Sequence, residues 1–154
     1  LIVSDSTNKS TNNTITTNDF HNYYHAVATF KKSDTNRYKI YVDGELKAET
    51  TGYNSNVFAS SDSFKIGAKT VSGTTGMNGN IDEVAFWKTK LTLTDVQNIY
   101  NSGVPNDISS YNPISWWRMG DNDDGTGTTV TDQGSAGNNG TLNNDAVFEA
   151  DTPS

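Results

Sequence analysis

The feature that most constrains the fold of this chain is a pair of alternating segments joined by Asp43-Gly44. RYKIYV, residues 37–42, alternates apolar and polar side chains, and ELKAET, residues 45–50, continues the alternation after the turn. An Asp-Gly pair supplies the two positive φ angles that a tight hairpin turn requires. The segment therefore predicts two neighbouring antiparallel strands.

Three further segments extend this β pattern. Residues 24–30 alternate in the same way and are joined to residues 37–42 by the polar turn KKSDTN, which predicts another hairpin. FKIGA, residues 64–68, predicts a short strand. Residues 81–87, IDEVAFW, carry apolar side chains on both faces, as expected for a strand inside a layered sandwich. The chain is expected to be an all-β protein.

One helix is expected, over residues 91–103. Thr92 is a suitable N-cap and Asp95 stands in the position of a capping box, while Leu91 and Val96 can form a hydrophobic staple. Gly103 can close the helix. Its predicted buried stripe consists of Leu93, Val96, Ile99 and Tyr100.

Length and charge exclude several classes of protein. A chain of 154 residues is long enough for one core, with a partial second unit as an alternative. The net charge is −7 and the Lys and Arg residues are scattered singly, so nucleic acid is not an expected partner. No apolar run is long enough to insert into a membrane. Cysteine is absent, which rules out disulfides and thiolate metal sites.

The stretch from Trp116 to Asn144 raises the question of whether it is a tail, a metal loop or a strand of the fold. It begins with two adjacent tryptophans and then becomes rich in Gly, Thr, Asn and Asp. Burial of one tryptophan contributes several kcal/mol, so we expect this stretch to be an integral part of the sandwich. Because neighbours on a strand point in opposite directions, one of Trp116 and Trp117 is expected near the surface.

An acidic cluster in this stretch is the best metal candidate. Calcium prefers several carboxylate and carbonyl oxygens from a flexible loop, and the cluster offers Asp121, Asp123, Asp124 and Asp132. The spacing departs from an EF-hand, because Gly125 occupies the fifth place instead of the sixth. A calcium site and a solvated acidic turn both remain open.

Five motifs, in their order and spacing, resemble the laminin-G-like branch of the concanavalin A-like lectin/glucanase superfamily. They cover roughly residues 20–103 and read Y-x-H-A-V-A-T-F, I-Y-V-D-G, F-K-I-G-A, G-N-I-D-E-V-A-F-W and L-T-L-T-D-V-Q-N-I-Y-N-S-G. The resemblance implies an antiparallel β-sandwich of jelly-roll type with one short helix. Calcium is common in laminin-G-like proteins, so the resemblance also implies calcium as a candidate ligand.

Residues 116–154 resemble the opening of a second such module, so the pieces stand in an unusual order. Either the chain is cut across two tandem modules, with the N-terminal part of the module in residues 1–103 absent, or the last segment is an edge repeat that completes the sandwich. Residues 104–115, with two prolines, are expected to be the linker. The combination of these two segments, including the string WWRMGD, also resembles segments of surface proteins of marine tailed bacteriophages.

Catalysis is not expected from these residues. Glucanases of the superfamily carry two glutamates around an aspartate on one strand, because retaining hydrolysis requires two carboxyl groups about 5 Å apart. The corresponding strand here holds Asp82 and Glu83 but no second glutamate at that spacing. No nucleophile elbow or phosphate-binding loop is present either.

The resemblance implies a non-catalytic recognition or adhesion module of an extracellular or virion-surface protein, which binds carbohydrate. Exposed aromatic rings can stack on sugars, and Tyr53, Trp116 and Trp117 are the candidates for glycan binding. The alternative is a structural or decoration protein that binds neighbouring subunits in an oligomeric assembly. The expected partners are thus a glycan or a neighbouring protein subunit, with calcium as the one candidate cofactor.

Overall fold

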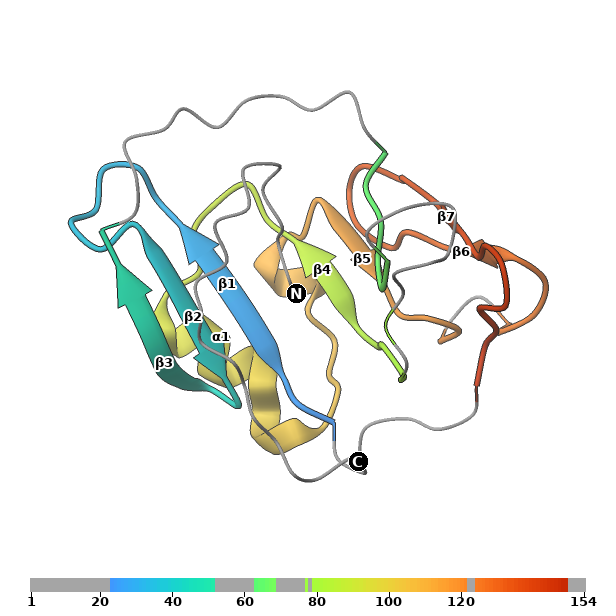
Figure 1. Ribbon diagram of the computed structural model, residues 1–154, viewed down its shortest axis with the longest axis horizontal. Coiled ribbons are helices and arrows are strands. Elements are labelled where there is room, and N and C mark those ends of the chain that lie inside the picture. Colours follow the sequence, from blue (N-terminus) through green and yellow to red (C-terminus); the bar gives the residue numbers. More distant parts are fainter. Residues whose placement is uncertain (1–22, 52–62, 69–76, 78, 122–123, 150–154) are drawn as a thin grey trace. The chain divides into compact units, whose positions relative to one another are not determined.

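The computed structural model describes residues 23–51, 63–68, 77, 79–121 and 124–149 (Figure 1). The chain forms two compact units, each assembled from separated segments. The first unit comprises Leu1–Tyr53, Thr89–Tyr111 and Pro153–Ser154, and the second comprises Asn54–Lys88 and Asn112–Thr152.

The first unit contains a three-stranded antiparallel sheet in the order β1-β2-β3. Its strands are β1 (Ala26–Phe30), β2 (Tyr38–Val42) and β3 (Glu45–Thr50). Val42 lies opposite Ala26 on one side and Glu45 on the other, so β2 is the central strand. The alternating pattern and the Asp-Gly turn therefore predicted these strands and their pairing correctly.

The short helix α1 (Leu93–Tyr100) belongs to the same unit and lies behind the sheet in Figure 1. Thr92 caps it as expected, since its side chain accepts from the backbone N–H of Asp95 at 3.1 Å while the Asp95 carboxylate accepts from the Thr92 N–H at 2.8 Å. Val96 is fully buried. The capping box specifies where the helix begins.

The end of the helix differs from the expectation. Asn101 adopts a left-handed conformation with φ 44° and closes α1, and a 3₁₀ turn, η1 (Asn101–Gly103), follows it. Asn tolerates this conformation better than most residues, so the helix stops before Gly103. The predicted buried stripe was wrong at Leu93, whose side chain is 47% exposed at the first turn.

Replacement of Thr92 by alanine is expected to lower the free energy of unfolding by about 1 kcal/mol, because an N–H group at the start of α1 loses its acceptor. Denaturant unfolding measures this difference. Thr92→Ser keeps the hydroxyl and should retain most of the stability. A loss no larger in Thr92→Ala than in Thr92→Ser would contradict the capping role.

The second unit is built from two small antiparallel pairs. In one, β4 (Val84–Phe86) pairs with β5 (Ser115–Trp117); in the other, β6 (Thr129–Val130) pairs with β7 (Gly140–Thr141). The stretch that begins at Trp116 thus forms strands with its own chain. That this stretch completes the sandwich stays a prediction, which the pairing of β5 with β4 supports.

Two predicted strands are shorter or missing, and positive φ angles explain both. Phe64–Ala68 forms no strand beyond an isolated bridge residue at Ala68, since Gly67 has a φ of 75°. Of residues 81–87, only Val84–Phe86 is a strand, because Glu83 has a φ of 52°. A left-handed residue interrupts the extended conformation of a strand.

The expectation that one tryptophan of the pair lies near the surface was wrong. Trp116 is 4% exposed and Trp117 is 7% exposed. Neighbouring side chains on a strand point in opposite directions, but here other side chains pack over both rings. The guanidinium of Arg118 lies over the Trp116 ring at 5.1 Å, while Trp117 packs against Phe64 and Phe86.

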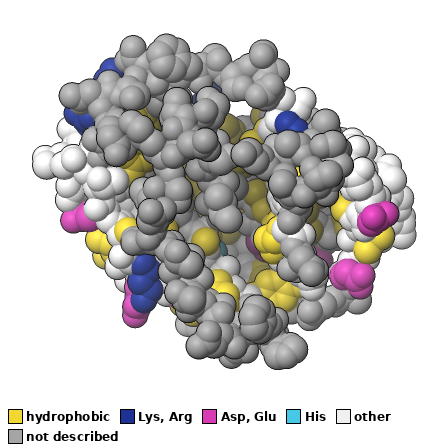
Figure 2. Space-filling view, viewed as in Figure 1, with side chains coloured by type: hydrophobic (Ala, Val, Ile, Leu, Met, Phe, Trp, Pro, Cys, Tyr) yellow, Lys and Arg dark blue, Asp and Glu magenta, His cyan; other side chains and the backbone are white. Residues whose placement is uncertain are grey.

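Residues 104–115, expected as a linker, include the 3₁₀ turn η2 (Ser109–Tyr111), the buried Ile108 and the first residue of β5. The proposed module boundaries at residues 103 and 116 stay predictions. In the described part of the chain, no helix is both long and apolar enough to cross a membrane. On the face drawn in Figure 2, Lys and Arg side chains occur in small separate groups.

Candidate functional site

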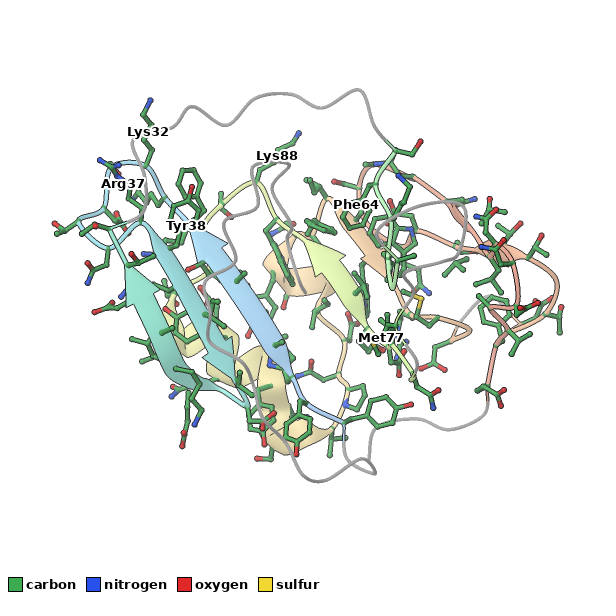
Figure 3. All side chains as sticks on the ribbon, in the orientation of Figure 1. Lys32, Arg37, Tyr38, Phe64, Met77 and Lys88 are labelled. Atoms are coloured by element: carbon green, nitrogen blue, oxygen red, sulfur yellow. The ribbon has the colours of Figure 1, made fainter. Side chains whose placement is uncertain are left out.

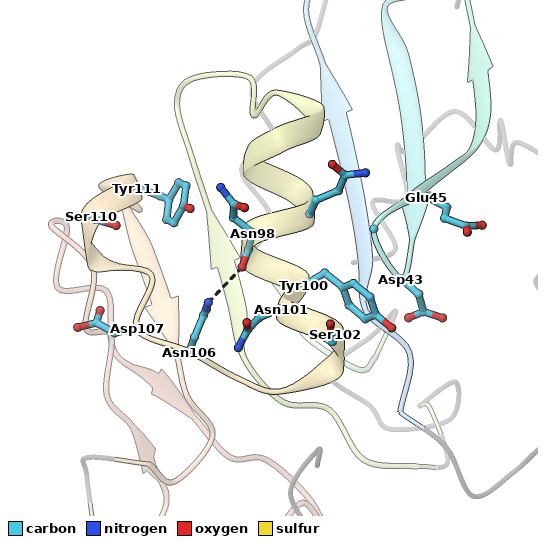
Figure 4. Close-up of a pocket in the computed structure, with 12 residues that line it drawn as sticks. Asp43, Glu45, Asn98, Tyr100, Asn101, Ser102, Asn106, Asp107, Ser110 and Tyr111 are labelled. Carbon is cyan, nitrogen blue, oxygen red and sulfur yellow. Dashed lines mark hydrogen bonds between the residues drawn. The ribbon is translucent and has the colours of Figure 1, made fainter.

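An open pocket of about 580 Å³ lies in the first unit, beside the C-terminal half of α1 (Figure 4). Three segments form it: the turn between β2 and β3, the helix from Gln97 onward, and the chain from Asn106 to Tyr111. Most of the side chains that line it are polar. Its amides belong to Gln97, Asn98, Asn101 and Asn106.

The turn between β2 and β3 forms one wall. Asp43 and Gly44 have φ angles of 50° and 75°, as the Asp-Gly pair predicts. The Asp43 carboxylate accepts from the backbone N–H of His25 at 2.9 Å, and the Asp43 N–H donates to the His25 carbonyl at 2.9 Å. A Cβ at position 44 would lie 3.0 Å from the Tyr100 ring, so glycine permits the turn to approach the helix closely.

The Tyr100 ring is held from the sheet side by His25, whose ring stacks on it at 5.8 Å between centroids. Burial lowers the pKa of His25, and the nearby Asp43 carboxylate opposes this only in part. The imidazole is therefore neutral at pH 7. The stack therefore places the Tyr100 ring of the pocket against a neutral side chain from the residue before β1.

The opposite wall is fixed by amide hydrogen bonds. The side chain of Asn106 donates to the backbone carbonyl of Asn98 at 3.1 Å (Figure 4). This bond connects the chain after the helix to the last turn of α1. The Asn101 amide donates to the Val104 carbonyl at 3.1 Å. Both bonds satisfy carbonyl groups with side chains and place Asp107, Ser110 and Tyr111 around the pocket.

A second polar cluster surrounds Trp116 in the other unit. The Glu83 carboxylate accepts from the Trp116 indole N–H at 2.6 Å and from Arg118 Nε at 2.8 Å. Arg118 also forms an ion pair with Asp121 at 2.9 Å. These contacts cover the Trp116 ring and hold the Glu83 carboxylate in an ion pair.

Asp82, next to this cluster, is a half-buried carboxyl. Burial, together with the neighbouring charges of Glu83 and Asp121, raises the pKa of Asp82 to about 6, although its Oδ1 accepts from the Glu83 N–H at 2.8 Å. The ordinary pKa of an aspartate carboxyl is 3.8, and the unfolded chain is expected to have that value. The folded protein therefore holds a proton between these two values that the unfolded chain has lost.

This difference predicts that the contribution of Asp82 to stability falls as the pH rises from about 4 through 6. Asp82→Asn is uncharged throughout and keeps an oxygen for the Glu83 N–H. We expect the variant to be more stable than the natural chain at pH 7.5, with the advantage disappearing near pH 4. Urea unfolding across this range measures it, with Asp145→Asn, an exposed site, as the control. A constant difference between Asp82→Asn and the natural chain would contradict the shift.

The residues predicted for glycan stacking do not form an exposed platform. Both tryptophan rings are buried, and Trp117 Nε1 donates to the Asn138 carbonyl at 2.8 Å. Tyr53 lies outside the described residues. The described aromatic residues of the pocket are Tyr100 and Tyr111 instead.

The predicted calcium ligands are engaged with protein donors where they are described. Asp121 pairs with Arg118, Asp124 accepts from the Thr126 hydroxyl at 3.0 Å, and Asp132 accepts from backbone N–H groups. Asp123 lies outside the described residues. Among the residues that are described, no three acidic or histidine side chains are grouped to hold a metal. Calcium stays a prediction, which melting curves in calcium and in EDTA would test.

Another exposed feature lies at the far end of the first sheet, where Phe30 and Tyr38 are cross-strand partners. Their ring centroids are 4.7 Å apart, and Phe30 is 40% exposed. Arg37 and Lys32 extend from the same end of the hairpin as Tyr38 (Figure 3). This aromatic pair was not predicted as a site, although the alternation of residues 24–30 placed Phe30 on one face.

The pocket was also missed by sequence reasoning. Its walls come from residues 43–45 and from residues 97–111, which are separated by about a third of the chain. The Asn-rich sequence after the helix is a weak signal for it, because Asn is equally common in ordinary turns. Only the packing of α1 against the sheet brings the two segments together.

Comparison with known proteins identifies the family of the chain. No curated protein and no solved structure gives a significant match. A family model of laminin G type, described as the concanavalin A-like lectin/glucanases superfamily, matches residues 2–97. Together with the antiparallel strands and the short helix, this match confirms the all-β sandwich class. The chain belongs to the concanavalin A-like lectin/glucanases superfamily.

Proposed function

We propose that the chain is a non-catalytic recognition module that binds carbohydrate in the pocket beside α1. The observation that carries this proposal is the lining of the pocket, where amide, carboxylate and hydroxyl groups surround two tyrosines. Sugar hydroxyls both donate and accept hydrogen bonds, and amide side chains offer both functions. Membership of a superfamily of lectins and glucanases supports a saccharide as the ligand.

The proposal does not include hydrolysis. A retaining glycosidase needs one carboxyl group to attack and another to protonate, about 5 Å apart. Glu83 is held by Arg118 and by the Trp116 indole, which occupies both of its oxygens. Glu83 is therefore not free to serve as the second catalytic carboxyl group beside Asp82. We place the module on an extracellular or virion surface, where recognition of glycans is useful.

A glycan array followed by titration calorimetry tests the proposal. Gln97 and Asn98 are exposed on α1 and line the pocket. The double variant Gln97→Ala/Asn98→Ala removes two side-chain amides. It keeps the backbone carbonyl of residue 98 that accepts from Asn106, and alanine favours the helix. We expect it to weaken binding about tenfold or more, since each lost hydrogen bond is worth roughly 1 kcal/mol.

Thr94→Ala is the matched control, because Thr94 is exposed on the same helix but does not line the pocket. It should bind as the natural chain does. If no saccharide on the array binds, the proposal fails. If saccharides bind equally well to the double variant, the pocket is not the binding site.

The aromatic pair of exposed Phe30 and half-buried Tyr38 favours a second candidate, a structural subunit that binds neighbouring proteins. Aromatic and arginine side chains are enriched in the central parts of protein interfaces. Phe30→Ala would then convert an oligomer into monomers in sedimentation velocity, while glycan binding stays unchanged. A monomer in both the natural chain and the variant would remove this candidate.

A further inference from the structure

The charge of the pocket indicates which saccharides it accepts. Its lining contains the carboxylates of Asp43, Glu45 and Asp107, and no Lys, Arg or His. The hydrogen bond that Asp43 accepts comes from a backbone N–H, which carries no formal charge. That bond leaves the negative charge of Asp43 in place. Lys47 pairs directly with Glu45 at 2.6 Å, whereas its interaction with Asp43 is electrostatic only.

The end of α1 adds to this negative potential. The helix ends at Tyr100, within the pocket lining, and its last turn contains no basic residue. The C-terminal end of a helix carries the negative end of the backbone dipole, equivalent to about half an elementary charge. The carboxylates and the helix end therefore act in the same direction, from two sides of the pocket (Figure 4).

We propose that this pocket selects saccharides that bear a protonated amine and rejects those that bear carboxylate or sulfate groups. The inference rests on the proposed function and gives it a substrate class. A unit charge at about 4 Å in water changes an equilibrium by roughly fivefold. A sugar ammonium should therefore strengthen binding about fivefold per facing carboxylate, and a sugar carboxylate should weaken it by a similar factor.

Three β-1,4-linked hexasaccharides test the selectivity: glucosamine, which carries amines; glucose, which is neutral; and glucuronate, which carries carboxylates. Calorimetry at pH 6, in 50 mM and 300 mM salt, compares their affinities. We expect the amine to bind at least about fivefold more tightly than the neutral sugar and the carboxylate at least about fivefold more weakly. High salt should reduce both differences, because it screens exposed charges.

Asp43→Asn is the decisive variant, since asparagine keeps an oxygen for the His25 N–H and tolerates the left-handed turn. It should reduce the amine preference about fivefold and change the affinity for the neutral sugar by less than about twofold. Glu49→Gln is the matched control. It alters the net charge equally, but Glu49 pairs with Lys39 outside the pocket. Asp107→Asn provides a second pocket variant if Asp43→Asn melts early.

The outcomes separate the two proposals. If no saccharide binds on the array or in solution, the proposed function is overturned and this inference with it. If other saccharides bind but none of the three hexasaccharides does, only this inference is overturned. Binding with equal affinities, or with preference for glucuronate, overturns only the charge selectivity. An equal loss in Glu49→Gln assigns the preference to net charge and overturns the role of the pocket. Equal binding of tetralysine and the amino sugar would mean that any cation is accepted, which overturns the saccharide class.

Discussion

A chain that ends at Asn112 is expected to lose the ordered structure of its second unit and to melt at a much lower temperature or aggregate. The cut removes β5, which pairs with β4 through Val84 and Trp117, and through Phe86 and Ser115. It also removes the Ile114 N–H that donates to the Phe86 carbonyl at 2.8 Å. The main chain of β4 would be left without these hydrogen bonds.

The side chains lost with β5 account for the size of the effect. Two buried tryptophans leave, and truncation of a single buried tryptophan costs about 3 to 5 kcal/mol. A whole domain is stable by only about 5 to 15 kcal/mol. Glu83 would also lose the Trp116 indole and Arg118, so a carboxylate would remain without its ion pair. The remaining apolar surface of Phe64 and Phe86 favours aggregation.

Circular dichroism melting and light scattering measure this outcome. The single variant Trp117→Ala is a milder form of the same test and should cost about 3 to 5 kcal/mol. Leu93→Ala is its matched control, because Leu93 is apolar but nearly half exposed, and should cost far less. If the chain ending at Asn112 keeps the melting temperature and mass of the full chain, the segment beyond it contributes nothing to the fold.

The sequence was most informative where local chemistry and tertiary structure agree. The alternation of residues 37–42 and the Asp43-Gly44 turn predict β2 and its neighbour, because a hairpin is specified by contacts close in sequence. The shift in register between Ile40 and Tyr41 was not predicted. Thr92 and Asp95 likewise identify the start of α1, since both partners of the capping box lie within one turn.

Backbone conformation was the least predictable property. Nothing in the local pattern indicates that Glu83 adopts a positive φ, which shortens β4, and the surrounding fold must compensate for this conformation. The same applies to Asn101, which ends α1 two residues before the expected glycine. The Glu83 contacts with Trp116 and Arg118 stabilise its side chain there, and they join residues more than thirty positions apart.

The candidate site was not predicted from the sequence, because it also depends on contacts between residues far apart in the chain. Sequence reasoning favoured Trp116 and Trp117 as ligand-binding residues, because a strand exposes alternate side chains when only one face is covered. In the second unit both rings of β5 have partners, so neither is available. The pocket in the first unit depends on the contact between Gly44 and Tyr100, which no periodicity encodes.

Asp132→Ala is expected to be the most damaging exchange of a polar residue, with a loss of about 3 kcal/mol or more in the free energy of unfolding. The buried Asp132 carboxylate accepts from the backbone N–H groups of Trp116 at 2.7 Å, Gly134 at 2.8 Å and Asn138 at 2.7 Å. Each buried donor left without an acceptor costs about 1 to 3 kcal/mol. The carboxylate thereby joins β5 to the loop that leads to β7.

The pH dependence gives an independent check on the same carboxylate. Burial by itself raises the pKa of Asp132, but the backbone donors of Trp116, Gly134 and Asn138 and the Ser115 side chain outweigh it and lower the pKa below the usual 3.8. The unfolded chain therefore takes up a proton before the folded one does. The contribution of Asp132 to stability is present above about pH 4 and is lost as the pH falls through the lower pKa of the folded state.

Two comparisons separate the hydrogen bonds from the charge. Asp132→Asn keeps one acceptor oxygen but turns an amide group toward a backbone donor, so its stability should fall between the natural chain and Asp132→Ala. Asp145→Ala removes an exposed carboxylate from the same unit and should change the free energy of unfolding by less than about 0.5 kcal/mol. Urea unfolding at pH 7 and at pH 3 measures all three. The advantage of the natural chain over Asp132→Asn should be smaller at the lower pH. A loss in Asp132→Ala no greater than in Asp145→Ala would show that the three N–H groups find other acceptors.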